Sequence, residues 1–501
     1  MPRGAPLTVL DDRTALNGAR IDVLARTSWI VRVARLVPPT GTTLTLEALA
    51  KRIGTNPARL HRLETGVLRD GALVDGYEQV LEAPTGSLRA PIDVTCRTFS
   101  YAPADRNGGT RLTTVPEVSR ATERVACGEA IGGDWLAWAR ALSAPAAVGM
   151  PESLAAELIG RLVSELGRSV GPAYPSRYEA LSLLRCSGYG HLVLAVAQQV
   201  VADQDVQVLN DLMSAVGEAV TPDAIDWCLA LLDDPRDRLV IGGALALENM
   251  GEICGDPAFW GPLTEPLVER FDGAVEGSVR EEWLSHLLRL VPSSAWSGTR
   301  SRPSRDLTPA AAIEDWTRSR LNDHWSTCEA RAGRVTSWLG LPDQPMLARL
   351  LFDIAISPHE SRAVTSYMLL GSHPRLASAL GAELAELAES HPDPVIRSRV
   401  GRRLPGMLHD AFPHQAKRWL RGADRELRDR ALLLAGNAGV PVEAEVLRTA
   451  LGEEGASARA ALYAAGMAAH PLLAEIASDG FGPCINGAAA WWLGQGSRVV
   501  A

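Results

Sequence analysis

Apolar residues recur at intervals of three and four positions along most of the chain, which is the period of a helix with one buried face. In one clear example, four residues stand at positions i, i+3, i+4 and i+7: Leu46, Leu49, Ala50 and Ile53. Ala, Leu and Arg are abundant, whereas runs of the residues that favour strands are scarce. The pattern therefore predicts an all-α protein.

Pro, Gly and Asp interrupt the periodic segments at close intervals, so the chain is expected to form one helix after another. Beyond residue 114, helices are expected at 115–127, 134–143, 151–169, 176–187, 190–201, 205–219, 222–233, 236–250 and 276–291. Residues 292–309 mix Ser, Pro and Arg without an apolar period, which predicts a mobile loop. These breaks predict the following division: a domain at 1–92, a linker at 93–114, and a helical body in two parts, 115–300 and 301–501.

Segments of similar pattern recur in the second half of the chain, each predicting a helix that ends in glycine. Four of the closing glycines are spaced 30, 30 and 28 residues apart: Gly406, Gly436, Gly466 and Gly494. Such a chain could form a large irregular helical domain or an α-solenoid, and internal repetition of this period favours the solenoid. The segments resemble HEAT-type repeats, in which Asp and Arg at the turn within a helix pair connect neighbouring pairs. The resemblance implies this role for Asp393 with Arg397 and for Asp424 with Arg428.

Residues 45–66 predict two short helices joined by a sharp turn. Thr45 can cap the first helix, and Gly54 can end it because glycine accepts the left-handed conformation of a tight turn. Asn56 can cap the second helix, with Pro57 at its first position. The sequence thus predicts a helix-turn-helix unit.

The second of these helices combines an apolar face with a basic one. Leu60 and Leu63 are expected to point inward, which leaves Arg59, His61 and Arg62 pointing outward. An α-helix fits the major groove of DNA, and arginine can bind guanine through two hydrogen bonds. The pattern therefore indicates DNA recognition, the alternative being a helical hairpin with solvated basic residues.

Residues 29–88 resemble the Cro/C1-type (XRE family) helix-turn-helix domain. The resemblance is carried by Leu49-Ala50, by Gly54 at the turn, and by the run "LHRLETG" from Leu60 to Gly66 in unbroken register. It implies a first helix around Trp29 and an ion pair between Arg35 and Glu64. The sequence departs from the family pattern in its longer loop "PPTGTTL" and in Leu46, which replaces a Gln that contacts the DNA backbone.

The same resemblance implies which residues meet double-stranded DNA. Base contacts would come from Asn56, Ala58, Arg59 and Arg62, and phosphate contacts from Thr45, Lys51 and their neighbours. His61 joins this set by its register. Arg300, Arg302 and Arg305 in the expected loop are alternative phosphate contacts, although a solvated loop is the simpler interpretation.

The charge of the chain is distributed unevenly, and this supports a DNA-binding head. The net charge is −9, but residues 1–90 carry 12 Lys and Arg against 9 Asp and Glu. The remaining residues carry 38 basic and 50 acidic groups. A cationic head on an acidic body is therefore expected, in which the body itself would repel DNA.

Other classes of protein find little support in the sequence. The seven cysteines are far apart without a C-x-x-C pair, so no zinc or other metal site is expected. Their odd number, with no signal peptide, indicates a reducing cytoplasm. No apolar run reaches the length of a membrane span. The motifs of hydrolases, metalloproteases and P-loop proteins are absent, so we expect no catalytic residues, no cofactor and no enzyme.

These observations predict a cytoplasmic, sequence-specific DNA-binding transcriptional regulator. Its helical body is expected to dimerise, or to bind a peptide, a small molecule or a protein. The first alternative is an interaction scaffold in which the hairpin docks a protein. The second is a DNA glycosylase built on HEAT-like repeats, which would need a cationic groove.

Overall fold

The computed structural model describes eight segments of the chain: residues 10–39, 43–101, 114–144, 149–296, 302–307, 321–453, 455–478 and 481–501. Helices dominate all the long segments, and the strand-like pairing recorded within them is a single bridge between Ser169 and Val499. The all-α class predicted from the sequence is confirmed.

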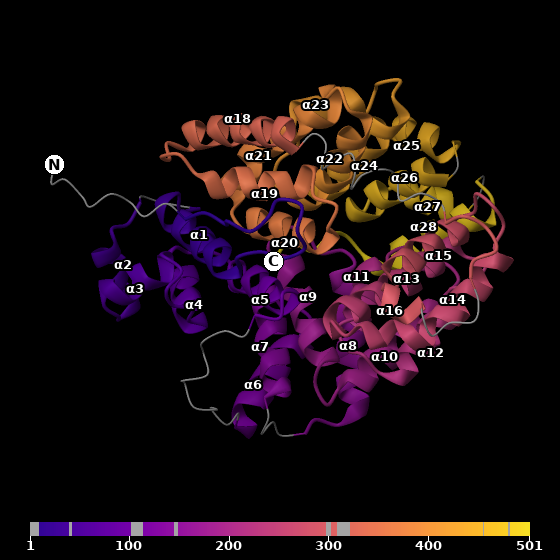
Figure 1. Cartoon of the computed structure of the whole chain (residues 1–501), viewed down its shortest axis with the longest axis horizontal. Helices are drawn as coiled ribbons and strands as arrows, with labels where there is room; N and C mark the ends of the chain where they lie inside the picture. Colours follow the sequence, from indigo (N-terminus) through magenta and orange to yellow (C-terminus); the bar gives the residue numbers. More distant parts are fainter. Residues whose placement is uncertain are drawn as a thin grey trace.

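The N-terminal helices lie together at one side of the molecule, in indigo in Figure 1. They are α1 (Val23–Leu36), α2 (Leu46–Ile53), α3 (Pro57–Glu64), α4 (Gly71–Val80) and α5 (Arg89–Thr98). Below, "the head" means residues 10–98. Within it α1 packs against α3, α4 and α5, and α2 packs against α3 and α4.

The expected boundary between the head and the linker falls inside a helix. The expected linker 93–114 begins in the middle of α5, which continues to Thr98. Ile92, Val94 and Cys96 are buried where α5 packs against the body helices α9 and α20. Residues 102–113 of that linker lie outside the described residues.

The first part of the body agrees with the expected helices. It comprises α6 (Val115–Ala126), α7 (Gly132–Ser143), α8 (Glu152–Leu166), α9 (Ala173–Arg185), α10 (Gly190–Ala202), α11 (Asn210–Val216), α12 (Pro222–Leu231), α13 (Asp237–Cys254), η2 (Pro257–Trp260), α14 (Gly261–Gly273), α15 (Val279–Leu290) and α16 (Ser293–Trp296). Helix α14 was not predicted, because prolines obscure its pattern. Pro262 stands in the first turn, which needs no N–H donor, and Pro266 lies farther along the helix.

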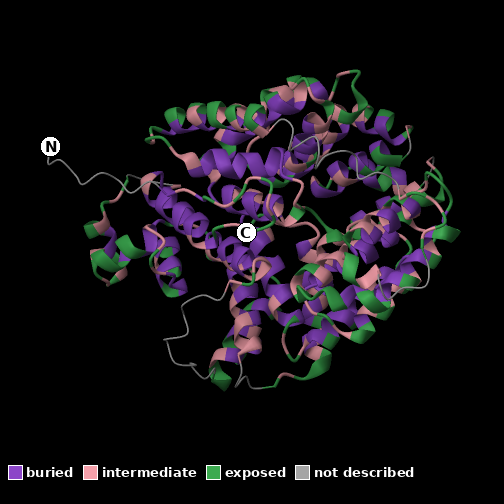
Figure 2. Cartoon of the chain, in the orientation of Figure 1, coloured by how far each residue is buried: buried purple, intermediate pink, exposed green. Residues whose placement is uncertain are grey.

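The second part of the body has the arrangement of a helical repeat. It comprises α18 (Leu321–Leu339), α19 (Pro345–Ala355), α20 (Glu360–Gly371), α21 (Pro374–Ser390), α22 (Pro394–Met407), α23 (His414–Trp419), α24 (Arg425–Ala438), α25 (Ala444–Leu451), α26 (Gly455–Met467), α27 (Leu472–Ser478) and α28 (Pro483–Gln495). From α21 onward, consecutive helices pack in pairs, and α22, α24, α26 and α28 pack against one another in turn. Figure 2, in the orientation of Figure 1, shows exposed residues along the outer side of α18 and the almost entirely buried α19 beneath it.

The periodic glycines lie near the ends of their helices, as expected, but they do not cap them. Each of α22, α26 and α28 has its periodic glycine as the second-last residue: Gly406, Gly466 and Gly494. Helix α24 passes Gly436 and ends at Gly439, which adopts a positive φ of 64°. A Cβ atom on Gly436 would lie 3.1 Å from the ring of Tyr463, and one on Gly466 would lie 2.1 Å from the ring of Trp492. At these two positions the repeat therefore marks the crossing of neighbouring helices, where a Cβ atom would be crowded at Gly436 and would clash at Gly466.

The Asp and Arg residues of the repeats also act differently from the expectation. Asp393 and Asp424 each accept a hydrogen bond at the start of their own helix, α22 or α24. Arg397 donates to the carbonyl of His391 at 2.6 Å, within its own turn. Arg428 pairs with Glu453, which precedes α26. Arg428 therefore connects its repeat to the next one, as expected, although its partner is a glutamate. Arg397 makes its hydrogen bond within its own repeat.

The second part of the body packs against the head, and the first part forms hydrogen bonds with the C-terminal segment. The apolar side chains of the head form one continuous core with those of α18–α24. Near the C-terminus, Val499 exchanges backbone hydrogen bonds with the segment after α8, at 2.9 Å to Val170 and 2.8 Å to Arg168. The head is thus built into the body, and the last residues return to the body's first part.

Candidate nucleic-acid interface

The hairpin at residues 45–66 has the turn and caps that its sequence predicts. The Thr45 hydroxyl accepts a hydrogen bond from the Ala48 amide at 3.2 Å, and Gly54 ends α2 with a φ of 79°. The Asn56 side chain accepts from the Arg59 amide at 2.7 Å, with Pro57 in the first turn of α3. These contacts satisfy amides at the starts of both helices and fix the direction in which α3 leaves the turn.

A buried ion pair supports α3 from below. Arg35 of α1 donates two hydrogen bonds to the Glu64 carboxylate, both at 2.6 Å, and the Tyr77 hydroxyl donates a third at 2.8 Å. Burial alone would lower the pKa of Arg35, but the hydrogen bonds and charge of Glu64 raise it overall. The pair implied by the family resemblance is confirmed, and it joins three helices around one carboxylate.

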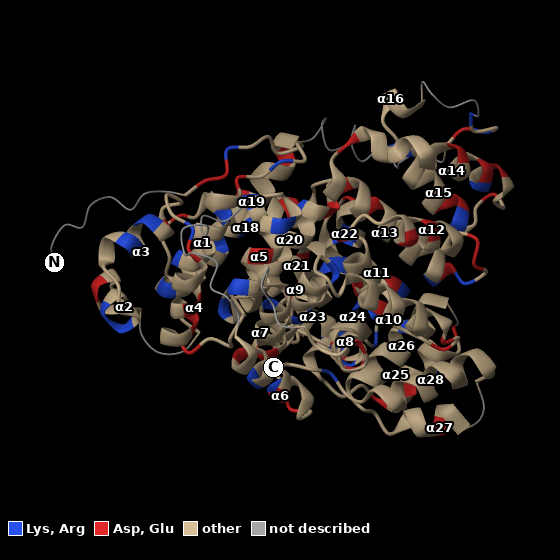
Figure 3. Ribbon diagram, turned by 90° about the horizontal axis from the view of Figure 1, so that it is seen from below, with Lys and Arg blue, Asp and Glu red and all other residues tan. Residues whose placement is uncertain are grey.

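The residues expected to meet DNA all lie on the exposed surface of this hairpin. The exposed set is Thr45, Lys51, Asn56, Ala58, Arg59, His61 and Arg62. Arg52, which was not predicted, is exposed beside Lys51. Figure 3 shows the Lys and Arg side of α2 and α3 at one end of the molecule. Exposed Glu47 is the acidic residue of α2.

Three of these side chains already have partners within the chain. The oxygens of Thr45 and Asn56 cap their helices, and the amide hydrogens of Asn56 remain available for an outside acceptor. Arg59 is half-exposed and forms an ion pair with Asp70. The structure records no ion pair for Lys51 or Arg62 among the described residues. Asp70, which the sequence reasoning missed, is therefore a further member of the site.

A second network attaches the head to the second part of the body. Asp353 of α19 lies 2.6 Å from Arg26 of α1 and 2.7 Å from Arg362 of α20, while Arg26 also donates to Asp12 at 2.6 Å. All four side chains are fully buried. Arg349 donates to the backbone carbonyl of Asp12. The orientation of the head relative to α19 and α20 is consequently set by charges that have no access to water.

A third network attaches α5 to the first part of the body. Arg97 pairs with Glu179 of α9 and, at 2.9 Å, with Glu218. Burial raises the pKa of Glu179 to about 7, against the lowering influence of Arg97, and nearby Asp93 and Glu218 add to the increase. The folded chain therefore binds this proton more tightly than the unfolded chain, in which the pKa has its ordinary value of 4.5.

This raised pKa predicts a stability change with pH. The stabilisation from protonated Glu179 is fully present below about pH 4.5 and is lost as the pH rises through about 7, with a slope of up to about 1.4 kcal/mol per pH unit. Glu179→Gln should remove that slope from the free energy of unfolding, measured by urea denaturation between pH 4.5 and 8. Glu47→Gln, at an exposed position, serves as the control. Parallel pH profiles for Glu179→Gln and the parent would show that this carboxyl group does not titrate in that range.

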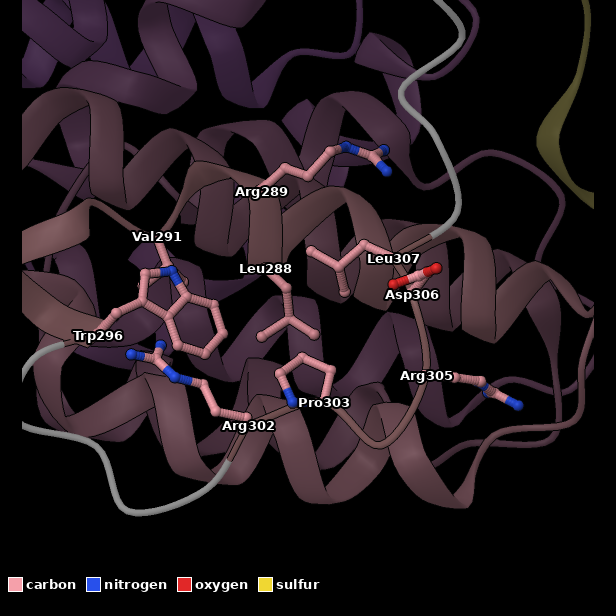
Figure 4. A pocket seen from close by; sticks show the side chains of 9 residues that line it. All are labelled: Leu288, Arg289, Val291, Trp296, Arg302, Pro303, Arg305, Asp306 and Leu307. Atoms are coloured by element: carbon pink, nitrogen blue, oxygen red, sulfur yellow. The ribbon is translucent and has the colours of Figure 1, made fainter.

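An open pocket lies away from the hairpin, at the end of the first part of the body (Figure 4). Its lining includes Leu288, Trp296, Arg302 and Arg305. The Arg302 guanidinium lies 4.9 Å from the centre of the Trp296 ring, and Arg305 donates to the carbonyls of Phe271 and Ala274. Arg302 and Arg305, which were considered as phosphate contacts, thus both contact other residues of the chain. Arg300, the third arginine considered, lies outside the described residues. The expected loop 292–309 includes the short helix α16, and its residues 297–301 and 308–309 also lie outside them.

The described residues contain no group of three His, Cys, Asp or Glu side chains arranged to hold a metal ion. No single helix in the same ranges is long and apolar enough to cross a membrane. Helices α9 and α10 meet that criterion only when they are taken together, and they are bent by 117° at the break between them. A comparison of the whole chain with protein-family models and with curated proteins finds no match to either.

Proposed function

We propose that the chain is a sequence-specific DNA-binding transcriptional regulator and that α3 enters the major groove. The observation that carries the proposal is the exposed basic face of the hairpin, with Arg59 and Arg62 on α3 and Lys51 and Arg52 on α2. A helix that presents arginines at the groove can bind base edges, while neighbouring basic residues bind phosphates. The Arg35–Glu64 pair beneath α3 holds this face in a fixed orientation.

In this proposal the head and the body have different functions. The head is a Cro/C1-type helix-turn-helix domain, and the body is a HEAT-like α-solenoid that supplies dimerisation and a surface for a peptide, a small molecule or a protein. One small module makes few phosphate contacts, so two heads on neighbouring half-sites would give the affinity that a regulator needs. The free state of all seven cysteines is compatible with a cytoplasmic location.

The test begins with a selection of bound duplexes from a random pool, because the operator is unknown. Arg59→Ala and Arg62→Ala are each expected to weaken binding to the selected site by roughly 1–3 kcal/mol if they read bases. Lys51→Ala should instead weaken specific and non-specific duplexes about equally and reduce the slope of log affinity against log salt by about one unit. Equilibrium binding across a salt series measures both effects.

Arg421→Ala is the matched control, since Arg421 is an exposed arginine of the body whose ion pair with Glu443 lies at the surface. It should leave both affinity and salt slope unchanged. Unchanged DNA binding by the Arg59 and Arg62 variants would mean that α3 does not enter the groove. An interaction that hardly weakens with salt would instead favour the protein-docking scaffold, because counterion release makes DNA affinity fall steeply with salt, whereas protein docking need not depend on salt in this way.

A further inference from the structure

Asp70 combines two contacts that usually belong to different residues. One oxygen of its carboxylate accepts the Leu73 amide at 3.2 Å and caps α4, while the other accepts a hydrogen bond from the Arg59 guanidinium. The side chain of Asp70 is 12% exposed, whereas that of Arg59 is 51% exposed. The carboxylate therefore sits at the inner end of the arginine and leaves the outer part of the guanidinium accessible.

The position of this carboxylate is itself fixed. Capping α4 holds the Asp70 side chain in one orientation. The preceding residue, Arg69, is buried and lies 2.8 Å from Asp93 of α5. Asp93 also accepts Arg89 at 2.7 Å and Arg140 of the body helix α7 at 2.9 Å. Asp70 thus belongs to a segment that is anchored to both α5 and the body.

From this geometry we propose that Asp70 is a positioning residue for sequence recognition, which holds Arg59 ready for a guanine. The inference rests on the proposed function of α3. A guanidinium has five N–H donors, so one bond to Asp70 leaves enough donors for the O6 and N7 atoms of guanine. An arginine held in advance loses less side-chain entropy on binding, and it selects one base rather than following the nearest phosphate.

Arg62 provides the contrast within the same helix. It is exposed, and the structure records no ion pair for it in the described part of the chain. Its guanidinium can therefore turn toward either a base or a phosphate. The preference for one base should consequently depend more strongly on Arg59 than on Arg62.

Because Asp70 is negatively charged, the affinity for non-specific DNA distinguishes a positioning role of Asp70 from a merely structural one. A carboxylate close to the DNA surface repels phosphates, so its removal should not weaken non-specific binding. Asp70→Asn keeps a side-chain oxygen for the α4 cap but removes the charge that holds Arg59. This variant should bind the selected site about tenfold more weakly, while its affinity for scrambled duplexes stays equal or rises.

The experiment applies the random-duplex selection and the equilibrium measurements to the full chain and to four variants: Asp70→Asn, Asp70→Ser, Arg59→Ala and the double variant Arg59→Ala/Asp70→Asn. Asp22→Asn is the matched control, because Asp22 caps α1 through the Ala25 amide at 2.9 Å and has the same charge in the same head. Thermal unfolding of each variant verifies that the head remains folded.

The inference is supported if the Asp70 variants lose preference at the same base pair as Arg59→Ala and if Asp70→Asn adds no loss to Arg59→Ala. Asp22→Asn should retain the parent's motif. If the parent selects a motif and Asp70→Asn selects it with equal preference at every position, the inference is overturned while the proposed function stands. A parent that enriches no motif contradicts the proposed function itself, and this inference with it.

Discussion

Replacing Asp353 with alanine is expected to lower the free energy of unfolding by about 3–5 kcal/mol. This carboxylate lies between the guanidinium groups of Arg26 and Arg362, with Ser366 as an additional donor at 3.3 Å, and it is fully buried. Its loss would leave two cations facing each other in the core, with only Asp12 to compensate Arg26. Chemical denaturation followed by circular dichroism measures the effect.

Two further variants test whether the destabilisation comes from the loss of a buried charge. Asp353→Asn keeps the shape of the side chain and should reproduce most of the destabilisation, because the missing charge is its main cause. Glu443→Ala removes one partner of the exposed pair with Arg421 and should change stability by less than about 1 kcal/mol. An Asp353→Ala variant as stable as the parent would show that the buried arginines find water or other partners.

Replacing Glu64 with alanine is the second change with a large expected effect. The substitution removes the acceptor of both Arg35 and Tyr77 and leaves a buried guanidinium without its carboxylate. We expect a cost of about 3–5 kcal/mol, concentrated in the head. Hydrogen exchange measured by mass spectrometry should show faster exchange of the amides in α2, α3 and α4.

The matched change in the neighbouring helix is Glu47→Ala, which removes an exposed carboxylate from the first turn of α2. It should cost only a few tenths of a kcal/mol. If Glu64→Ala leaves exchange in α3 at the parent's rate, the apolar contacts of Leu60 and Leu63 alone hold the hairpin. The buried ion pair would then have no role in orienting α3.

The features that the sequence predicted correctly are those that nearby residues determine. The cap by Asn56, the turn at Gly54 and the inward direction of Leu60 follow from positions within a few residues of each other. Such contacts can be inferred from the chain because the partner is always at a known spacing.

The features that escaped prediction involve partners that are distant in the chain, or residue types that can serve more than one structural role. Arg26 and Asp353 are 327 positions apart by their residue numbers, and each could equally have been a solvated surface residue. Arg59 and Asp70 are 11 positions apart, but they belong to different helices and to no helical spacing. Gly466 lies near the end of α26 as expected, but its close approach to Trp492 escaped prediction, because a small residue at a crossing and a glycine that ends a helix look the same in one sequence.

The described residues of the head pack directly into the body, and, if the chain binds DNA as proposed, this affects how it would find two half-sites. A domain on a flexible linker reaches sites at many separations, with an effective concentration that depends on linker length. Here the Asp353 network and the shared core fix α3 relative to the body. In a dimer held together by the bodies, the distance between the two copies of α3 and their angle around the DNA axis would therefore be built into the protein. The folded body would then determine which spacing of half-sites, and which rotation of one half-site relative to the other around the DNA axis, the two copies of α3 can bind.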